Sequence, residues 1–322
     1  MKVYHGLETI TPPIERAVLT IGNFDGVHRA HQQLLAQAGL FAANTRGRVV
    51  VMTFDPHPLS VVAPERAPER LSPPDEKLRL LQEAGADIVV VARSDTALLG
   101  LEAEAFVRRV IVERFHPTHV VEGPSFGFGR GRAGDPALLR RLSDTYGFAV
   151  HIVEPVLLEV DAGASALVSS SLVRRLLGDG RVHRAALCLG RPYTLIGRVV
   201  RGRQRGRNLG FPTANVAVTG QLLPADGVYA GQVVVAKPIP PESARYAAAV
   251  SIGTAPTFGD GHRVVEAHLL AFDGDLYGRD IRVELIRWLR PQRRFDSAEA
   301  LTEQLRRDAA AVRCDDGTDV VA

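Results

Sequence analysis

The 322-residue sequence is poor in cysteine, in long apolar runs and in net charge. Its two cysteines, Cys188 and Cys314, lie far apart, which argues against a disulfide framework and against a structural zinc site. No run approaches the roughly 18 apolar residues of a membrane span, and the N-terminus lacks the apolar core of a signal peptide. A net charge of +3 requires no nucleic-acid and no membrane partner. We therefore expect a cytoplasmic protein.

The remaining composition is that of a globular protein, with 46% hydrophobic and 23% charged residues. In the first half, short apolar runs alternate with helical patterns, beginning with residues 18–21 and 27–43. This βαβα rhythm predicts a doubly wound, Rossmann-like α/β domain, with a mostly parallel sheet and helices on both faces. Its ligand is expected beyond the carboxyl ends of the strands.

In the second half the apolar pattern becomes strand-like. The expected strands are residues 193–200, 227–235, 246–252, 264–272 and 281–287. Strands at this spacing indicate an antiparallel β-barrel or sandwich, of which we expect the barrel, and residues 297–312 have the pattern of a closing amphipathic helix. We place the first domain at residues 1–186, the second at 187–313 and a flexible tail at 314–322.

Four polar segments, two of them rich in glycine, each follow an expected strand, the last one after an intervening loop. They are residues 22–26, 55–58, 123–129 and 169–171. Because the carboxyl ends of parallel strands meet at one edge of a sheet, these segments are expected to converge there. The first one leads to His28 and His31, which share one face at the positive end of an expected helix. This arrangement predicts a polyanion site, although two solvated histidines or a chance metal pair also fit the spacing.

These motifs, in this order, resemble the FMN adenylyltransferase module of bacterial bifunctional flavin-cofactor enzymes, which are nucleotidyltransferases with a His-x-Gly-His motif. The resemblance is carried by residues 20–35, 52–58, 123–129 and 169–174. It implies catalytic roles for His28, His31 and Arg174. The implied ATP or phosphate contacts are Gly22, Asn23, Phe24, Asp25, Gly26, Ser170 and Ser171. The implied flavin contacts are Asp55, Pro56, His57, Ser125, Phe126 and Phe128.

Three positions depart from that family pattern. Ala30 stands between the histidines where the family has glycine, Ser125 stands where Asn or Asp is expected, and Gly127 stands where Arg is frequent. Alanine favours a helix by about 1 kcal/mol over glycine, but its methyl group takes up space next to a nucleotide.

The second half contains Gly210-Phe-Pro-Thr-Ala-Asn215, which alone is typical of a turn that enters a strand. Its surroundings resemble the riboflavin kinase module. The matching segments are residues 195–215, 227–231, 251–258, 265–268 and 272–278. The resemblance implies that Thr213 and Asn215 bind Mg²⁺, that Gly210 and Asn215 contact ATP phosphates, and that Glu266 is the general base. Hydroxyl and amide oxygens suit Mg²⁺, and a carboxylate can accept the proton of a primary alcohol.

A lone glutamate such as Glu266 would more often be an outward charged residue on a strand. The kinase pattern also has two departures, since Ser251 and Ala255 stand where the family usually has Asn and Arg. Residues 198–207 contain several arginines, which could bind RNA. Because they directly precede the 210–215 motif, a mobile loop that covers phosphates or a solvated surface is the better interpretation.

Taken together, the two resemblances imply a bifunctional enzyme whose partners are small molecules, acting as a monomer or weak homo-oligomer. It would phosphorylate riboflavin to FMN with ATP and Mg²⁺, and then adenylylate FMN to FAD with release of pyrophosphate. Two alternatives remain at this point. One is a diverged paralogue with a weakened module or an altered flavin-like substrate, and the other is a non-catalytic regulator that binds flavin or nucleotide.

Overall fold

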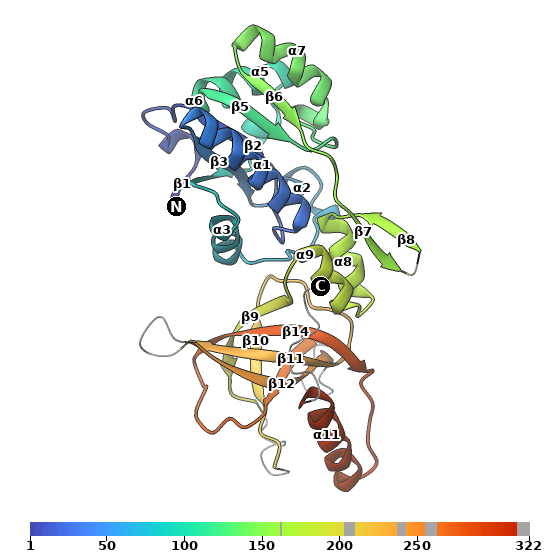
Figure 1. Ribbon diagram of the computed structural model, residues 1–322. Coiled ribbons are helices and arrows are strands. Elements are labelled where there is room, and N and C mark those ends of the chain that lie inside the picture. The colour runs from blue at the N-terminus through green and yellow to red at the C-terminus, as the bar shows by residue number, and fades with distance from the viewer. Residues whose placement is uncertain (162, 203–209, 237–242, 255–262, 314–322) are drawn as a thin grey trace. The chain divides into compact units, whose positions relative to one another are not determined.

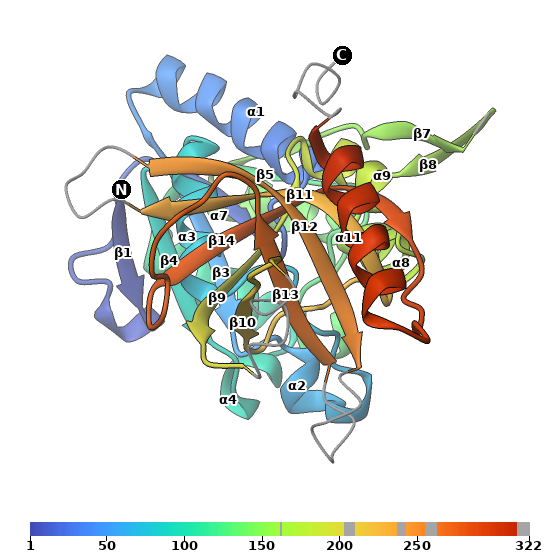
Figure 2. The same ribbon diagram turned by 90° about the horizontal axis from the view of Figure 1, so that it is seen from below.

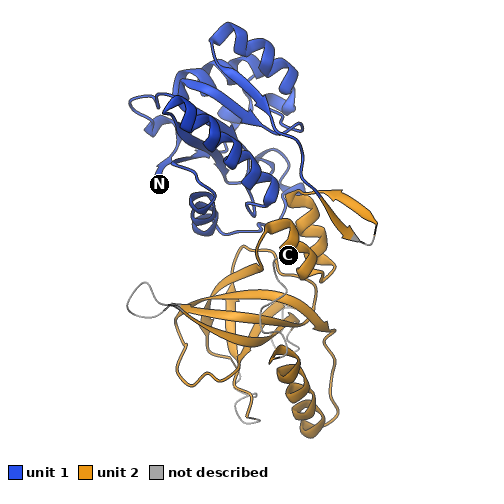
Figure 3. Ribbon diagram, in the orientation of Figure 1, with its two compact units in different colours: residues 1–157 blue, residues 158–322 orange. Residues whose placement is uncertain are grey.

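The computed structural model describes residues 1–161, 163–202, 210–236, 243–254 and 263–313 (Figure 1). The chain divides into two compact units, residues 1–157 and 158–322 (Figure 3). Our division after residue 186 stays a prediction, and the expected tail at 314–322 lies outside the described residues. In the described part of the chain, no helix is both long and apolar enough to cross a membrane.

The first unit contains a parallel sheet of six strands in the order β1-β4-β3-β2-β5-β6. The strands are β1 (Lys2–His5), β2 (Ala17–Ile21), β3 (Arg48–Asp55), β4 (Ile88–Arg93), β5 (Pro117–Glu122) and β6 (Ala149–Ile152). The helices are α1 (Arg29–Thr45), α2 (Leu59–Val62), α3 (Pro74–Glu83), α4 (Thr96–Leu99), α5 (Ala103–Phe106), α6 (Glu113–Phe115) and α7 (Pro136–Tyr146), with a π-helical segment η3 (Val107–Val112) and 3₁₀ turns η1 (Leu7–Thr9), η2 (Pro64–Arg66) and η4 (Arg130–Arg132). The predicted doubly wound α/β domain is confirmed.

Two apolar clusters cover the two faces of this sheet. Because successive side chains of a strand point to opposite faces, Val51 of β3 packs into one cluster and its neighbour Met52 into the other. The first cluster includes Leu35 of α1 and Leu81 of α3. The second includes residues of α5, η3, α6 and α7, such as Phe106. Helices therefore cover both faces, as the alternating pattern predicted.

Strand β2 is the point at which the strand order reverses. It pairs with β3 on one side and with β5 on the other, so the chain continues from β2 in one direction along the sheet and later returns to its other side. In doubly wound sheets, ligands bind at the carboxyl ends of the strands that flank such a point. The segments after β2, β3 and β5 are therefore the place to look for a site.

The second unit begins with a hairpin and two helices and continues into a closed antiparallel barrel, with strand order β10-β13-β12-β11-β14-β9. Its elements are β7 (Leu157–Asp161), β8 (Ala164–Leu167), α8 (Ser170–Gly178), α9 (Val182–Leu189), β9 (Tyr193–Val200), β10 (Ala214–Val218), β11 (Gly227–Ala236), β12 (Ser243–Thr254), β13 (Arg263–Leu269), β14 (Asp280–Arg290) and α11 (Ala298–Arg313). Strands β7, β8 and β10 were absent from the sequence prediction, and the predicted barrel and closing helix are confirmed.

Helix α11 lies along β11 and β12 of the barrel (Figure 2). It buries Ala309 and Val312 against the barrel. The helix is also held by Arg290, at the end of β14, whose Nη2 and Nε donate to the Asp308 carboxylate at 2.6 and 2.9 Å. The Arg290 and Asp308 side chains are 17% and 5% exposed, so this ion pair is largely withdrawn from water.

Replacing Asp308 with alanine should destabilise the barrel unit by about 3 kcal/mol, because Arg290 would keep a buried, unpaired charge. Urea unfolding followed by the fluorescence of Trp288, the only tryptophan and a residue of β14, measures this. As a control, Glu303→Ala removes exposed ion pairs with Arg306 and Arg307 on the same helix and should cost under about 0.5 kcal/mol. Equal losses in the two variants would contradict the prediction.

Candidate active sites

The turn after β2 brings His28 and His31 to the start of α1. The Gly22 N–H donates to the Met52 carbonyl at 3.0 Å and so extends the pairing of β2 with β3. Phe24, Gly26 and Val27 then have positive φ angles of 49°, 80° and 38°, which make the chain turn sharply. His28 is the N-cap residue of α1. Two imidazoles therefore lie at the positive end of this helix, where anions bind favourably.

The two imidazole rings stack on each other. Their centroids are 3.6 Å apart with an interplanar angle of 16°, and Phe24 covers His31 at 4.8 Å. Burial lowers the pKa of His31 well below its usual value, and the nearby charges of His28 and Lys77 lower it further. The buried Nδ1 of His31 has no hydrogen-bond partner among the described residues. At neutral pH His31 is thus an uncharged ring with an unused polar atom, which suits a hydrogen bond to a ligand.

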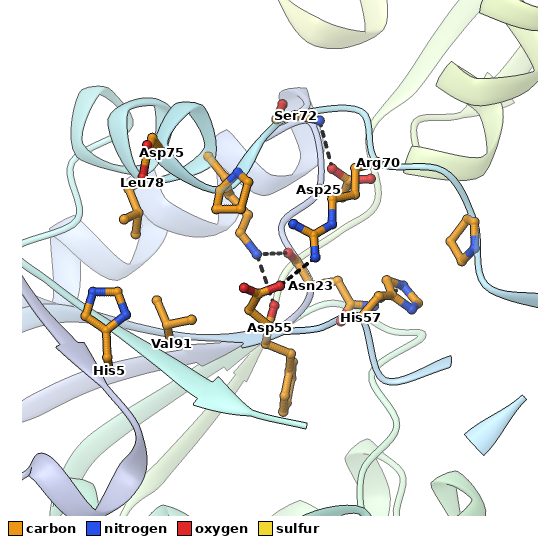
Figure 4. Close-up of a pocket in the computed structure, with 14 residues that line it drawn as sticks. His5, Asn23, Asp25, Asp55, His57, Arg70, Ser72, Asp75, Leu78 and Val91 are labelled. Carbon is orange, nitrogen blue, oxygen red and sulfur yellow. Dashed lines mark hydrogen bonds and ion pairs between the residues drawn. The ribbon is translucent and has the colours of Figure 1, made fainter. Parts of the chain in front are cut away.

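A charged cluster lies between the end of β3 and the start of α3, and its residues line a cavity of about 90 Å³ (Figure 4). At its centre, Lys77 Nζ donates to Thr53 Oγ1 at 3.1 Å and to the Phe54 carbonyl at 3.2 Å, with the Asn23 carbonyl at 3.4 Å. Burial lowers the pKa of Lys77, while the carboxylates of Asp25 and Asp55 oppose that shift. The lysine thereby links the ends of β2 and β3.

Asp25 and Asp55 are two of the carboxylates in this cluster. Asp25 accepts hydrogen bonds from the Leu71 N–H at 2.9 and 3.0 Å and from the Ser72 N–H at 3.1 Å. Asp55 forms an ion pair with Arg70 at 2.7 Å. Asp25 therefore holds the 71–72 loop in place, and its contact with ATP stays a prediction.

His57 also lines this pocket. Its Nδ1 accepts from the Leu59 N–H at 3.1 Å, and its Nε2 lies 3.0 Å from the Asn23 amide nitrogen. The structure thus brings the predicted residues Asn23, Asp25, Asp55 and His57 to one pocket. Sequence reasoning missed two cations beside them. Arg70 ends a short segment rich in Pro, Glu and Arg, Lys77 lies on helix α3, and no local signal marked either one.

The loop after β5 is built on aromatic packing. Phe126 stacks on Phe128 at 5.4 Å, and Phe128, only 4% exposed, packs on Phe106 at 5.9 Å. The guanidinium of Arg132 donates to the Ser125 carbonyl at 2.9 Å and lies 3.0 Å from where a Cβ on Gly127 would be. Arg132 therefore fills the space next to this glycine, and the flavin contacts of the loop stay predictions.

The remaining residues predicted for the first site lie on α8. The Ser169 side chain caps this helix by accepting from the Leu172 N–H at 3.2 Å. Ser170, Ser171 and Arg174 occupy its first turns. They belong to the second compact unit, so their contact with the same nucleotide as His28 stays a prediction.

A buried carboxyl group lies at the switch point of the sheet. Glu122 ends β5, is 2% exposed, and its Oε1 accepts from the Ile21 N–H at the end of β2 at 2.6 Å. Burial raises the pKa of Glu122 well above its usual value, although the Ile21 hydrogen bond opposes the shift. This side chain joins two strands at the point where their backbone pairing, last seen at Leu19 and Val120, has ended.

The kinase motif forms a row of side chains across three adjacent barrel strands. Glu266 of β13 lies opposite Asn215 of β10 on one side and opposite Ser251 of β12 on the other. Directly opposite residues in antiparallel strands share one face of the sheet. Their chain neighbours Val216 and Val265 are buried inside the barrel. Asn215, Glu266 and Ser251 therefore lie together on its outer face.

The Asn215 side chain packs closely against Gly202 at the β10 end of this row. A Cβ on Gly202 would lie 2.2 Å from the Asn215 amide nitrogen, so a side chain there would push the Asn215 amide out of its place. Thr213 comes directly before the first residue of β10, two residues before Asn215. Nδ1 of His268 is 2.8 Å from the Pro212 carbonyl, which fixes the segment entering β10. Gly210 is exposed with φ of 79°.

The row offers two oxygen-bearing side chains that suit Mg²⁺, the Asn215 amide and the Glu266 carboxylate, and the Thr213 hydroxyl comes just before it in the chain. Burial raises the pKa of Glu266. In the described residues no group of three or more His, Cys, Asp or Glu side chains could hold a metal ion by itself. Ala255 and the arginines at 203, 205 and 207 lie outside the described residues.

Comparisons with known proteins agree with this division of sites. A model of the FAD synthetase family matches residues 11–170, and a model of the riboflavin kinase family matches residues 189–314. The bifunctional riboflavin kinase/FMN adenylyltransferase of Escherichia coli strain K12 is 38% identical over 316 residues, 97% of each chain. The chain belongs to this bifunctional family. The resemblance predicted from the motifs is thereby confirmed.

Another family member and a solved structure also match over nearly the whole chain. The bifunctional riboflavin kinase/FMN adenylyltransferase of Pseudomonas fluorescens is 36% identical over 314 residues, again 97% of each chain. The crystal structure of a Streptococcus pneumoniae protein, described as a macrolide-efflux protein, is 29% identical with a TM-score of 0.85. That match covers 97% of this chain and 99% of the other. Both modules of the riboflavin kinase/FMN adenylyltransferase family are therefore present.

The raised pKa of Glu122 makes a pH-dependent contribution to stability. For an acid whose folded pKa lies above its unfolded value of about 4.5, stability is fully present below pH 4.5 and is lost as pH rises through the folded pKa. Each unit of that difference costs about 1.4 kcal/mol at high pH. Glu122→Gln keeps an acceptor for the Ile21 N–H without the charge, so the first unit should lose less stability between pH 5 and 8 than wild type.

Urea unfolding followed by far-ultraviolet circular dichroism at several pH values tests this, with Trp288 fluorescence reporting the barrel unit as an internal control. Wild type and Glu122→Gln with the same slope of stability against pH would show that Glu122 does not titrate differently on folding.

Proposed function

We propose that this chain makes FAD from riboflavin in two ATP-dependent steps, with the barrel unit phosphorylating riboflavin and the sheet unit adenylylating the resulting FMN. The observation that carries the proposal is the tandem match of the two family models, which divide the chain between them. Cytoplasmic location, small-molecule partners and a monomeric or weakly associated state belong to the same proposal.

In the kinase step, Glu266 takes the proton of the primary alcohol of riboflavin as the alcohol oxygen attacks the γ-phosphorus of ATP and ADP leaves. The raised pKa of Glu266 supports this role, because a stronger base accepts the proton more readily. Thr213 and Asn215 would hold Mg²⁺ with the ATP phosphates, and Gly210 would contact those phosphates. The metal would neutralise charge on the phosphate oxygens.

In the transferase step, a phosphate oxygen of FMN attacks the α-phosphorus of ATP, and pyrophosphate leaves. His28 and His31 donate hydrogen bonds to phosphate oxygens from the N-terminus of α1, next to the Gly22–Gly26 turn. Ser170, Ser171 and Arg174 of α8 would bind the same phosphates. Since ATP is anionic, its binding should raise the pKa of His31.

In this proposal the flavin ring of FMN lies beside Asp55, Pro56 and His57. The pocket there also contains Arg70 and Lys77, and two cations suit the phosphate of FMN. Ser125, Phe126 and Phe128 would border the same ligand.

The direct test incubates the chain with riboflavin, ATP and Mg²⁺ and separates the products by chromatography. FMN and FAD are both expected, and a chelator should abolish FMN formation. Formation of FMN without FAD would exclude the adenylyltransferase activity and would support a diverged paralogue with one weakened module. Bound flavin without any product would instead support a regulator.

Glu266→Gln should lower the kcat of FMN formation by about 10²- to 10⁴-fold, because the alcohol loses its proton acceptor. Riboflavin binding, followed by flavin fluorescence, should persist, and FAD formation from supplied FMN should be unchanged. Glu284→Gln is the matched control, since Glu284 lies on β14 in an ion pair with Arg245. Full kinase activity in Glu266→Gln would exclude Glu266 as the base.

His31→Gln should lower FAD formation from supplied FMN by about 10²- to 10³-fold, because one donor to the transition state is lost or misplaced. FMN formation from riboflavin should stay at the wild-type rate. His119→Gln is the control, because the His119 ring stacks on Phe41 at 5.2 Å, outside the proposed contacts. A similar loss in both variants would point to a folding defect rather than to catalysis.

A further inference from the structure

We propose that Gln292 is a positioning residue of the kinase site, which holds the Ser251 hydroxyl as a hydrogen-bond donor beside Glu266. The inference rests on the proposed function, in which Glu266 accepts the proton of the flavin alcohol. Gln292 lies outside the kinase motifs in the sequence, two residues beyond the end of β14.

Two contacts place the Gln292 amide on the outer face of β12. Its Nε2 donates to Ser251 Oγ at 2.9 Å. Two residues further along the same face, an added Cβ on Gly253 would lie 2.1 Å from Gln292 Oε1 and 2.7 Å from Nε2. The absence of a side chain at Gly253 therefore makes the room in which the amide lies.

The hydrogen bond determines what the Ser251 hydroxyl can do. A hydroxyl has one hydrogen to donate and two lone pairs to accept with. Because Gln292 occupies a lone pair as donor, the hydrogen of Ser251 is available for another acceptor. Ser251 lies directly opposite Glu266, with Cβ atoms about 5 Å apart in such pairs. The hydrogen can thus reach the alcohol oxygen that gains negative charge as Glu266 removes its proton.

The chain on either side of Gln292 is well anchored. Arg290 is bound to Asp308 of α11, and Arg293 donates a hydrogen bond to Gln304 of the same helix. The backbone that carries Gln292 is therefore fixed before substrate binds. A preorganised donor costs less entropy at the moment of reaction.

Gln292→Ala and Ser251→Ala should each lower the kcat of FMN formation about tenfold. This is the effect expected when one hydrogen bond to the transition state is lost. The KM for ATP and the riboflavin dissociation constant from flavin fluorescence should stay within about twofold, because the donor acts mainly on the transition state. The double variant should be no slower than either single variant, since the two side chains act as a unit.

Two further variants separate positioning from simple attachment of the segment. Gln292→Glu keeps the size of the side chain, but its carboxylate accepts from Ser251 and turns the hydrogen away, so it should lose at least as much kcat as Gln292→Ala. Adding Ser251→Asn to Gln292→Ala puts an amide donor on β12 itself and should restore part of the lost kcat.

The matched control is Gln304→Ala. Gln304 donates to Asp308 at 2.8 Å and accepts from Arg293, so its loss loosens the same segment without touching Ser251. Its kinase kcat should fall much less than that of Gln292→Ala, because the Arg290–Asp308 ion pair still holds the segment and the Ser251 contact is intact. FAD formation from supplied FMN should be normal in every variant. Unchanged kcat in Gln292→Ala, or an equal loss in Gln304→Ala, would overturn the role of Gln292. Absence of FMN formation by the wild-type chain would instead overturn the proposed function.

Discussion

The two-residue period of paired strands decides where the chemistry of the barrel unit can lie. Val216 and Val265 point into the barrel and fill its core, and this forces Asn215 and Glu266 to face outward side by side. A slip of one residue in the pairing of β10 and β13 would bury a carboxylate and expose valines. The packing of the core therefore fixes the geometry of the site, and the catalytic side chains need not determine the register themselves.

In the parallel sheet unit, the loops rather than the strand register determine where the site side chains lie. Its site side chains bind backbone groups of the loops, as Lys77 does with the carbonyl of Phe54 and Asp25 does with the N–H groups of Leu71 and Ser72. The same residues thus hold the loops in place and line the pocket. A ligand that displaced one of these contacts would also have to compensate a buried polar group of the backbone.

How far the sequence predicts the molecule depends on whether a signal is local. Alternating apolar runs and the 22–26 turn are local, and both units, the closing helix and the placement of Asn23, Asp55 and His57 around one pocket follow from them. Strand β1 has few apolar residues and lies at an edge, so its pattern is weak. Arg70 and Gln292 gain their positions from partners 15 and 41 residues away, and such contacts leave no periodic trace in the sequence.

The barrel and the parallel sheet also differ in how they avoid association through strand edges. The barrel closes on itself, so each of its six strands has a neighbour on both sides. The parallel sheet has open edges at β1 and β6, but these strands are only four residues long. The unit that emerges first from the ribosome therefore offers another chain little backbone to pair with while the barrel is still being made.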